Sequence, residues 1–570
     1  MILNTIIFSI LSVLIVFSTL GYGLVFTNKI LQNNQYLNLP IKGIFGIFFL
    51  YIISSVTHLV VPHNYTHNII LLIIGLLIFS IFLKKGFVKK KEIKTIFLVF
   101  TFLFIGFLIS KTNEDFPYYH LPNSLQFSTH KLEFGLGNLN HGFKHVSSIF
   151  LINSVFYLPY VEIYLYNITN FLLQIFFFSG IIIFIKKKNL NNFSKILITF
   201  SLITFLTKFY RLSEYGSDYI GQFLVLLSFI FASFALSKKR LNIKQKEQLF
   251  LISILLIVFS ITTKFLYVIY IIIPLILFLY LFSFREIIKF SLNKRMLLVS
   301  TFSLSLFIFF NFTATGCFLY PVSLTCLTES IDWTISETTI KSLNLHYKAW
   351  SKAGIGTGYG ITNHQEYISG INWVDNWFKK YFFTKVSDYL LILILISLIF
   401  VIFFKKHFTK NHKIDFNIKA VVICYLSITI VFLLWFFNFP TLRYAGYTIV
   451  FLILVLPISL FLAKNVNFSK KVVIKKINIL LIMAVLIFNA KNVQRLNKEF
   501  NYSNNEHHNF YNFPYFWVDD VKFKTILIED KYFYEIIDNK FCWNVPSTCL
   551  KDISLLKIEK KKGYFFYRKK

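Results

Sequence analysis

Residues 249–283 read LFLISILLIVFSITTKFLYVIYIIIPLILFLYLFS. One charge, Lys264, separates two apolar runs at 249–263 and 266–283. Runs of about this length cross the apolar core of a bilayer as helices, since a helix satisfies its own backbone hydrogen bonds there. The stretch predicts two transmembrane helices joined by a very short turn. Two explanations are open for Lys264 at that turn. It binds a phosphate or a carboxylate, or it simply forms part of the turn.

The whole chain has the composition of a polytopic membrane protein. It has 570 residues, of which 56% are hydrophobic, and its mean hydropathy is +0.63. A soluble domain of this size carries many more polar residues. The partner that this composition predicts is the lipid bilayer.

Apolar runs recur along the chain and predict about fourteen transmembrane helices. We expect them at residues 5–26, 42–61, 68–84, 95–110, 161–185, 193–207, 219–236, 249–263, 266–283, 296–313, 387–404, 419–437, 447–463 and 475–490.

The net charge of +33 comes largely from short basic clusters between these runs. Such clusters are typical of cytoplasmic loops, so we predict no nucleic-acid partner. With fourteen crossings, every cluster lies on one side, which places both termini and the intervening longer segments outside the cytoplasm. The clusters are Lys84–Lys91, Lys186–Lys188, Lys238–Arg240, Lys294–Arg295, Lys405–Lys406 and Lys470–Lys471.

This topology divides the chain into three parts. We expect N-terminal membrane helices at 1–94 and a membrane domain at 95–490, whose outer loops are 111–160 and 314–386. An extracytoplasmic appendage of a few strands follows at 491–570. Function is expected on the outer face, because the cytoplasmic loops are short and merely basic.

Four of the five cysteines form two close pairs in the predicted outer segments. Cys317 and Cys326 lie in one loop, and Cys542 and Cys549 lie in the appendage. Each pair closes a short loop in an oxidising compartment, so we predict two disulfides. Cys424 lies within a predicted span and is expected to pack as a small apolar residue. No spacing of cysteines or histidines indicates a zinc site.

The densest polar stretch follows the fourth predicted span. Residues 111–148 read KTNEDFPYYHLPNSLQFSTHKLEFGLGNLNHGFKHVSS, with the acidic pair Glu114 and Asp115 at the membrane boundary. A carboxylate there is either a general base for a hydroxyl nucleophile or the cap of the next helix. The segment 146–160 is too short and polar to span easily, and it predicts a helix lying in the membrane interface.

Five motifs together resemble bacterial polytopic proteins of GT-C glycosyltransferase-like architecture. The resemblance runs from about Glu114 to the C-terminus. The motifs are Asp115 with Tyr119-His120-Leu121 and Gly135-Leu-Gly-Asn138, SEYGSDY at 213–219, NFTATGCFLYPVSLTCLTESIDW at 311–333, FPTLRYAGY at 439–447, and CWNVPSTC at 542–549.

The resemblance implies an all-α membrane enzyme that transfers a sugar, with inversion, from a polyprenyl-phosphate carrier outside the cytoplasm. By correspondence with the acidic residue of that group, Asp115 would be the base, with Glu114 beside it. In that group the acidic residue usually lies in the first outer loop. Here it follows the fourth span, so the first three spans would be an N-terminal addition. The implied location is the inner membrane of a bacterium.

Further residues are candidates for binding such a donor. Arg443 either contacts a lipid phosphate or extends from the interface into water, and Tyr444 follows it in the same motif. Arg211 and Asp218 either contact substrate or pair with each other. His120 either orients the donor or is a structural histidine.

Two tryptophan-containing segments are candidates for sugar stacking. One is Asp332-Trp333, and the other holds Trp373, Asp375 and Trp377. The alternative for both is anchoring at the membrane interface.

The function expected from these residues is transfer of a sugar from a polyprenyl-phosphate donor to an envelope glycan, lipid or protein. The alternatives are a transporter or flippase for such lipids, and an envelope-assembly protein without catalysis. The sequence implies no cofactor, and nothing in it supports a divalent metal.

Overall fold

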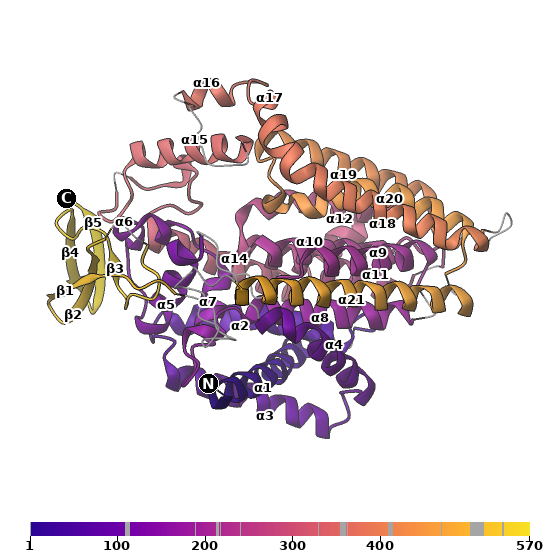
Figure 1. Cartoon of the computed structure of the whole chain (residues 1–570), viewed down its shortest axis with the longest axis horizontal. Helices are drawn as coiled ribbons and strands as arrows, with labels where there is room; N and C mark the ends of the chain where they lie inside the picture. The colour runs from indigo at the N-terminus through magenta and orange to yellow at the C-terminus, as the bar shows by residue number, and fades with distance from the viewer. Residues whose placement is uncertain are drawn as a thin grey trace.

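Figure 1 shows a computed structural model of the chain. The structure describes residues 2–32, 34–108, 115–187, 190–212, 216, 218–239, 241–328, 330–353, 361, 363–408, 414–468, 470–501, 518–538 and 541–570.

The fold is a bundle of long helices with small β-sheets at one end. We call the end beside strands β1–β5, on the left of Figure 1, the sheet end. Within the described residues, ten helical segments are long and apolar enough to cross a membrane. They contain α1 (Ile2–Phe26), α2 (Leu39–His58), α3 (Tyr65–Lys84), α8 (Ile168–Ile185), α11 (Ile243–Thr263), α14 (Lys294–Thr315), α18 (Ser387–Phe404), α19 (Ile418–Asn438), α20 (Tyr447–Asn465) and α21 (Lys471–Asn501).

The other four expected spans also fall on helices, but these helices are shorter or more charged. The 17-residue α9 and α10 are shorter than the ten, and the first turns of α4 carry several charges. The protein is therefore a multi-pass membrane protein, and the count of fourteen crossings stays a prediction. The four are α4 (Lys90–Leu108), α9 (Asn192–Lys208), α10 (Asp218–Phe234) and α12 (Ile272–Leu281), which continues the 3-10 helix η5 (Phe265–Ile271).

Asparagine side chains begin several of the long helices. The side-chain oxygens of Asn38, Asn64, Asn191 and Asn242 each accept a hydrogen bond from a backbone N–H in the first turn. These bonds satisfy donors that a helix start leaves without partners. The asparagine-rich composition thus helps to set where apolar runs become helices.

A chain of short helices follows α4 at the sheet end. The helix expected in the membrane interface is α7, and that prediction is wrong, because all its residues are buried by protein. It packs against α2, α5, α8 and α11. The short helices are η2 (Phe116–His120), α5 (Leu121–Thr129), α6 (Leu136–Leu139), η3 (His141–Lys144), α7 (Ser148–Ser154) and η4 (Ile163–Leu165).

The second long loop carries a separate set of short helices near the sheet end. They are η6 (Ser323–Thr325), α15 (Glu337–Ala353), α16 (His364–Ile368), α17 (Val374–Trp377) and η7 (Phe378–Val386). Elsewhere the bundle contains η1 (Thr27–Leu31), α13 (Phe284–Ser291), η8 (Lys405–His407) and η9 (Leu442–Gly446).

The C-terminal segment forms two small sheets. One has the order β1-β2-β3, with β1 and β2 antiparallel and β2 and β3 parallel, and the other is the antiparallel pair β4-β5. The strands are β1 (Phe523–Ile528), β2 (Lys531–Ile536), β3 (Cys549–Leu550), β4 (Leu556–Lys561) and β5 (Tyr564–Lys569).

These sheets pack onto the segment that follows α4. Phe134 exchanges backbone hydrogen bonds with Phe565 and Tyr567, both of 2.9 Å. Lys531 forms a buried ion pair of 2.5 Å with Glu133. Buried side chains of α6 and η3 share one apolar core with those of the sheets. The sheets therefore position the residues beside Asp115.

Both predicted disulfides are present, Cys317–Cys326 and Cys542–Cys549. Cys424 is buried as a free thiol, as expected.

Candidate functional site

Four charged residues lie at helix ends on the sheet side of the bundle. Asp115 precedes η2, Asp218 begins α10, Lys264 ends α11, and Arg443 lies in η9. Far apart in sequence, they meet in space and are called the charged cluster below.

One guanidinium joins the two carboxylates of the charged cluster. Arg443 Nε donates to Asp218 Oδ2 at 3.0 Å, and Arg443 Nη2 donates to Asp115 Oδ2. Lys264 Nζ donates to Asp218 Oδ1 at 2.5 Å. Of the alternatives for Lys264, the structure thus shows the carboxylate partner. Two acids and two bases balance in charge, and each can still be reached by solvent, with 16–32% of its side chain exposed.

The turn that carries Arg443 is held by side chains from neighbouring elements. The backbone N–H of Leu442 donates to Tyr381 Oη at 2.7 Å. Trp377 Nε1 donates to the carbonyl of Pro440 at 2.8 Å, and Tyr270 Oη donates to that of Ala445 at 2.9 Å. Such contacts fix the backbone turn from which the Arg443 side chain extends.

These contacts also correct the role expected of one tryptophan segment. Trp373 and Trp377 are buried in the protein, with 0% and 3% exposed. They therefore neither stack on a sugar nor anchor in the interface. Asp375 is exposed and pairs with Lys379.

Aromatic rings lie over the basic side chains of the charged cluster. Lys264 Nζ is 4.4 Å from the centre of the Tyr444 ring, and Arg443 Cζ is 5.6 Å from that of Trp350. The two rings are 5.8 Å apart. A cation over an aromatic face is stabilised by the negative potential of that face. Trp350 lies on α15, and the sequence contains no signal that would have placed it here.

The Asp115 side chain does not cap the helix that follows it. It makes no capping hydrogen bond to η2. Burial raises the pKa of this carboxyl, but Arg443 and His120 lower it more, so the net pKa lies below its usual value. Asp115 is therefore ionised at neutral pH. Glu114 lies outside the described residues.

His120 lies buried beside the charged cluster. Its ring packs against Tyr119 and Phe150, with centres 4.2 and 5.4 Å away. Burial lowers its pKa to about 4, although the neighbouring carboxylates favour the charged form. A neutral, packed imidazole agrees with the structural alternative and leaves its contact with a donor untested.

Of the two alternatives for Arg211 and Asp218, pairing with each other is not what the described residues show, and contact with substrate stays a prediction. Asp218 is paired with Lys264 and Arg443, whereas Arg211 Cζ lies 5.9 Å from the ring centre of Tyr210.

A histidine–tyrosine group adjoins the charged cluster. Tyr347 Oη of α15 lies 2.8 Å from His141 Nε2 and 3.4 Å from His145 Nε2. Tyr118 stacks on His141 at 5.7 Å. Burial lowers the pKa values of His141 and His145 to about 4 and about 3. Their crowding was visible in the sequence, but their tyrosine partner was not.

A family model described as "Domain of unknown function (DUF8201)" matches residues 1–450. The chain belongs to this DUF8201 family. No curated protein and no solved structure matches the chain. The DUF8201 match includes all four residues of the charged cluster and ends inside α20, before α21 and the sheets.

Across the described part of this DUF8201 chain, no three or more His, Cys, Asp or Glu side chains lie close enough to hold a metal ion.

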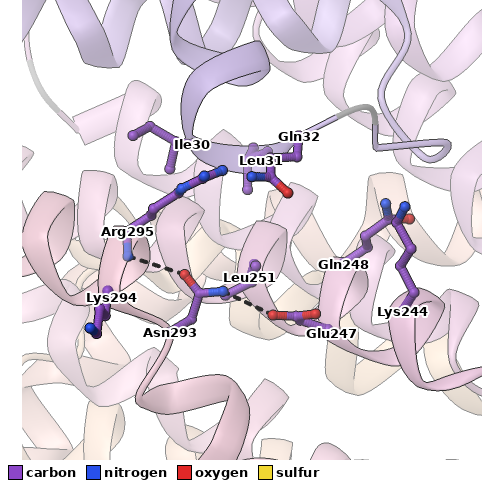
Figure 2. Close-up of a pocket in the computed structure, with 10 residues that line it drawn as sticks. All are labelled: Ile30, Leu31, Gln32, Lys244, Glu247, Gln248, Leu251, Asn293, Lys294 and Arg295. Atoms are coloured by element: carbon purple, nitrogen blue, oxygen red, sulfur yellow. Dashed lines mark hydrogen bonds between the residues drawn. The ribbon is translucent and has the colours of Figure 1, made fainter.

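A hollow at the end of the bundle opposite the sheet end is lined by polar side chains that do not belong to the charged cluster. It lies where η1 meets the first residues of α11 and α14 (Figure 2). Asn293 accepts from the Arg295 N–H at 3.2 Å and donates to Glu247 at 2.9 Å. Because α11 spans about 30 Å at 1.5 Å per residue, this hollow is far from Lys264. Its hydrogen bonds cap the start of α14 and join α14 to α11 and η1.

A second hollow lies between the second long loop and strands β4 and β5. It is lined by Asp332, Trp333 and Arg568 among others. Arg568 pairs with Asp332 at 3.2 Å, and Trp333 packs against Phe134 and Phe566. The predicted Asp332–Trp333 segment therefore faces the sheets.

Proposed function

We propose that this protein is a GT-C-like glycosyltransferase that takes a sugar from a polyprenyl-phosphate donor on the outer side of the membrane. The observation that supports it is the convergence of Asp115, Asp218, Lys264 and Arg443 at one end of the bundle. A base and two cations are the groups that this transfer needs. Fourteen crossings and external termini belong to the same proposal.

The donor phosphate would compete with the carboxylates for the cations. Arg443 can turn its planar guanidinium from Asp115 to two phosphate oxygens, and Lys264 can add a third contact. Asp115 would then be left ionised and without its strongest partner. Its affinity for a proton rises when the guanidinium leaves, which makes it a better base.

The transfer step then balances in atoms and charge. The acceptor hydroxyl gives its proton to Asp115 as its oxygen bonds to the anomeric carbon of the sugar. The bond from that carbon to the phosphate oxygen breaks, and the lipid phosphate leaves with the electron pair. Arg443 and Lys264 stabilise the charge that develops on this leaving group. Attack opposite to the leaving phosphate inverts the anomeric carbon.

Sugar transfer by a single-residue variant tests this proposal. Purified protein is given a panel of polyprenyl-phosphate sugars together with an envelope extract as acceptor. Asp115→Asn should lower the transfer rate by about 100-fold or more, because a general base contributes about 10²–10⁴-fold. Asp375→Asn is the matched control, since Asp375 is exposed and its ion pair is with Lys379, outside the charged cluster.

Each rival function predicts a different result. A flippase would move the lipid between leaflets without breaking the sugar–phosphate bond. An assembly protein would support envelope synthesis equally well with Asn at position 115. Undiminished transfer by Asp115→Asn would remove Asp115 from the role of base.

A further inference from the structure

A second group of cations lies at the sheet end, outside the charged cluster. Lys208 ends α9, Lys385 lies in η7, and Lys491 lies in the last third of α21. These three residues are called the lysine cluster below. They come from segments nearly 300 residues apart, and none belongs to the mechanism described above.

Direct contacts place Lys208 beside Lys491 and beside the helix that follows Lys385. Lys491 Nζ donates to the carbonyl of Thr207, the neighbour of Lys208, at 3.0 Å. Lys208 Nζ lies 4.7 Å from the ring centre of Tyr447 and 5.7 Å from that of Tyr389. Tyr389 lies one helical turn after Lys385, on the helix that continues from η7.

Positive charge predominates around Lys208. Burial, together with the charges of Lys491, Lys385 and Arg211, lowers the pKa of Lys208 to about 8. Among the described residues, Asp388 is the carboxylate that opposes this effect. Like charges held this close repel one another unless an anion lies among them.

Lipid-facing surfaces begin beside the lysine cluster. On α18, Leu391 and Leu395 are 61% and 50% exposed. On α21, Ile482 and Leu486 are 60% and 63% exposed. Exposed leucine and isoleucine on spanning helices contact the acyl chains of lipids. The lysine cluster lies just beyond these apolar stretches, at the depth of the headgroups of the same lipids.

We propose that the lysine cluster binds the phosphate of a phospholipid headgroup in the leaflet at the sheet end. Its acyl chains would lie along α18 and α21, and its phosphate among Lys208, Lys385 and Lys491. This binding goes beyond the proposed reaction and does not depend on it, because it involves no bond making or breaking.

Equilibrium binding in detergent tests this proposal with phosphatidylglycerol as the probe and phosphatidylcholine as background. A surface lysine contributes about 1 kcal/mol to anionic lipid binding. Loss of one lysine should therefore weaken binding about 5-fold, and Lys208→Gln with Lys491→Gln should weaken it about 25-fold. Lys385 is exposed, so Lys385→Gln is a variant that should leave folding intact and weaken binding about 5-fold.

Matched controls separate a site from general charge. Lys238→Gln with Lys239→Gln removes two exposed lysines from the loop before α11 and should leave affinity within about 2-fold, because that loop lies at the other end of α11, about 30 Å away, where charge interactions are screened. Lys208→Arg with Lys491→Arg keeps both charges and should bind phosphatidylglycerol about as well as the parent protein. Equal weakening by the Lys238/Lys239 variant, or no weakening by any lysine-cluster variant, would overturn the proposal.

Two further ligands identify the source of the phosphate. Inorganic phosphate should not displace phosphatidylglycerol at equal concentration, because it lacks the acyl chains. Binding of polyprenyl monophosphate should depend on Arg443 rather than on the lysine cluster. Displacement of phosphatidylglycerol by inorganic phosphate would contradict a phospholipid site. So would a result in which Lys208 is needed to bind polyprenyl phosphate but not to bind phosphatidylglycerol.

Discussion

At the scale of single residues, Arg443 decides the geometry of the charged cluster. Its guanidinium reaches Asp218 with one nitrogen and Asp115 with another. The planar fork of arginine can do this with two donors in fixed directions, whereas a lysine ammonium is one compact charge. The two carboxylates would otherwise repel each other across a half-buried space.

Replacing Arg443 by lysine tests this bridging role. Arg443→Lys should keep one carboxylate contact and lose the other. It should reduce kcat/KM for sugar transfer by about 10–100-fold, because a charge-assisted hydrogen bond contributes about 1.5–3 kcal/mol. Arg568→Lys, in β5, is the control and should leave kcat/KM unchanged. Equal activity of Arg443→Lys and the parent protein would show that the bridge is dispensable.

The buried His120 predicts a pH dependence of stability. In the folded protein its pKa is lowered to about 4, below the usual unfolded value of about 6.5. The unfolded state therefore binds the proton first, and stability falls as pH falls from about 6.5 to about 4. The Tm in detergent should decrease across this window, and less so for His120→Gln. His364→Gln, in α16, is the control and should keep the slope of the parent protein. If His120→Gln keeps that slope too, His120 is not the cause.

At the scale of elements, the C-terminal sheets support the segment that carries Asp115. The disulfide loop reaches η2, because the backbone N–H of Trp543 donates to the carbonyl of Pro117 at 3.3 Å. The Trp543 ring packs on Phe116, and Asn140 donates to the sulfur of Cys542. A loose appendage would allow Asp115 to move away from Arg443.

Removal of this disulfide should loosen η2. Cys542→Ser with Cys549→Ser should cost about 2–3 kcal/mol, the value for a loop of this length. Hydrogen exchange of residues 116–120 should become faster. The matched control, Cys317→Ser with Cys326→Ser, should leave exchange of those residues unchanged. Unchanged exchange in the first variant would mean that the sheets do not support η2.

At the scale of the whole molecule, apolar runs predicted the helices well because each long run in a bilayer has few alternatives to a helix. The isolation of Lys264 in an apolar stretch marked it for attention but left a phosphate, a carboxylate and a plain turn as alternatives, and the structure shows the carboxylate. The buried α7 was misjudged, because its apolar residues suit a protein interior as well as a membrane interface. Tyr347 and Trp350 were missed because α15 carries no local signal of their distant partners. Tyr347 reaches His141 and His145, and Trp350 reaches Arg443 and Tyr444.

In the proposed mechanism, the charged cluster binds the donor phosphate and releases Asp115. A cryo-EM structure of the protein with polyprenyl phosphate tests it most directly. Phosphate oxygens should lie about 3 Å from Arg443 and Lys264, with the bond between Arg443 and Asp115 broken. A lipid phosphate bound elsewhere, with Arg443 still bonded to Asp115, would contradict it.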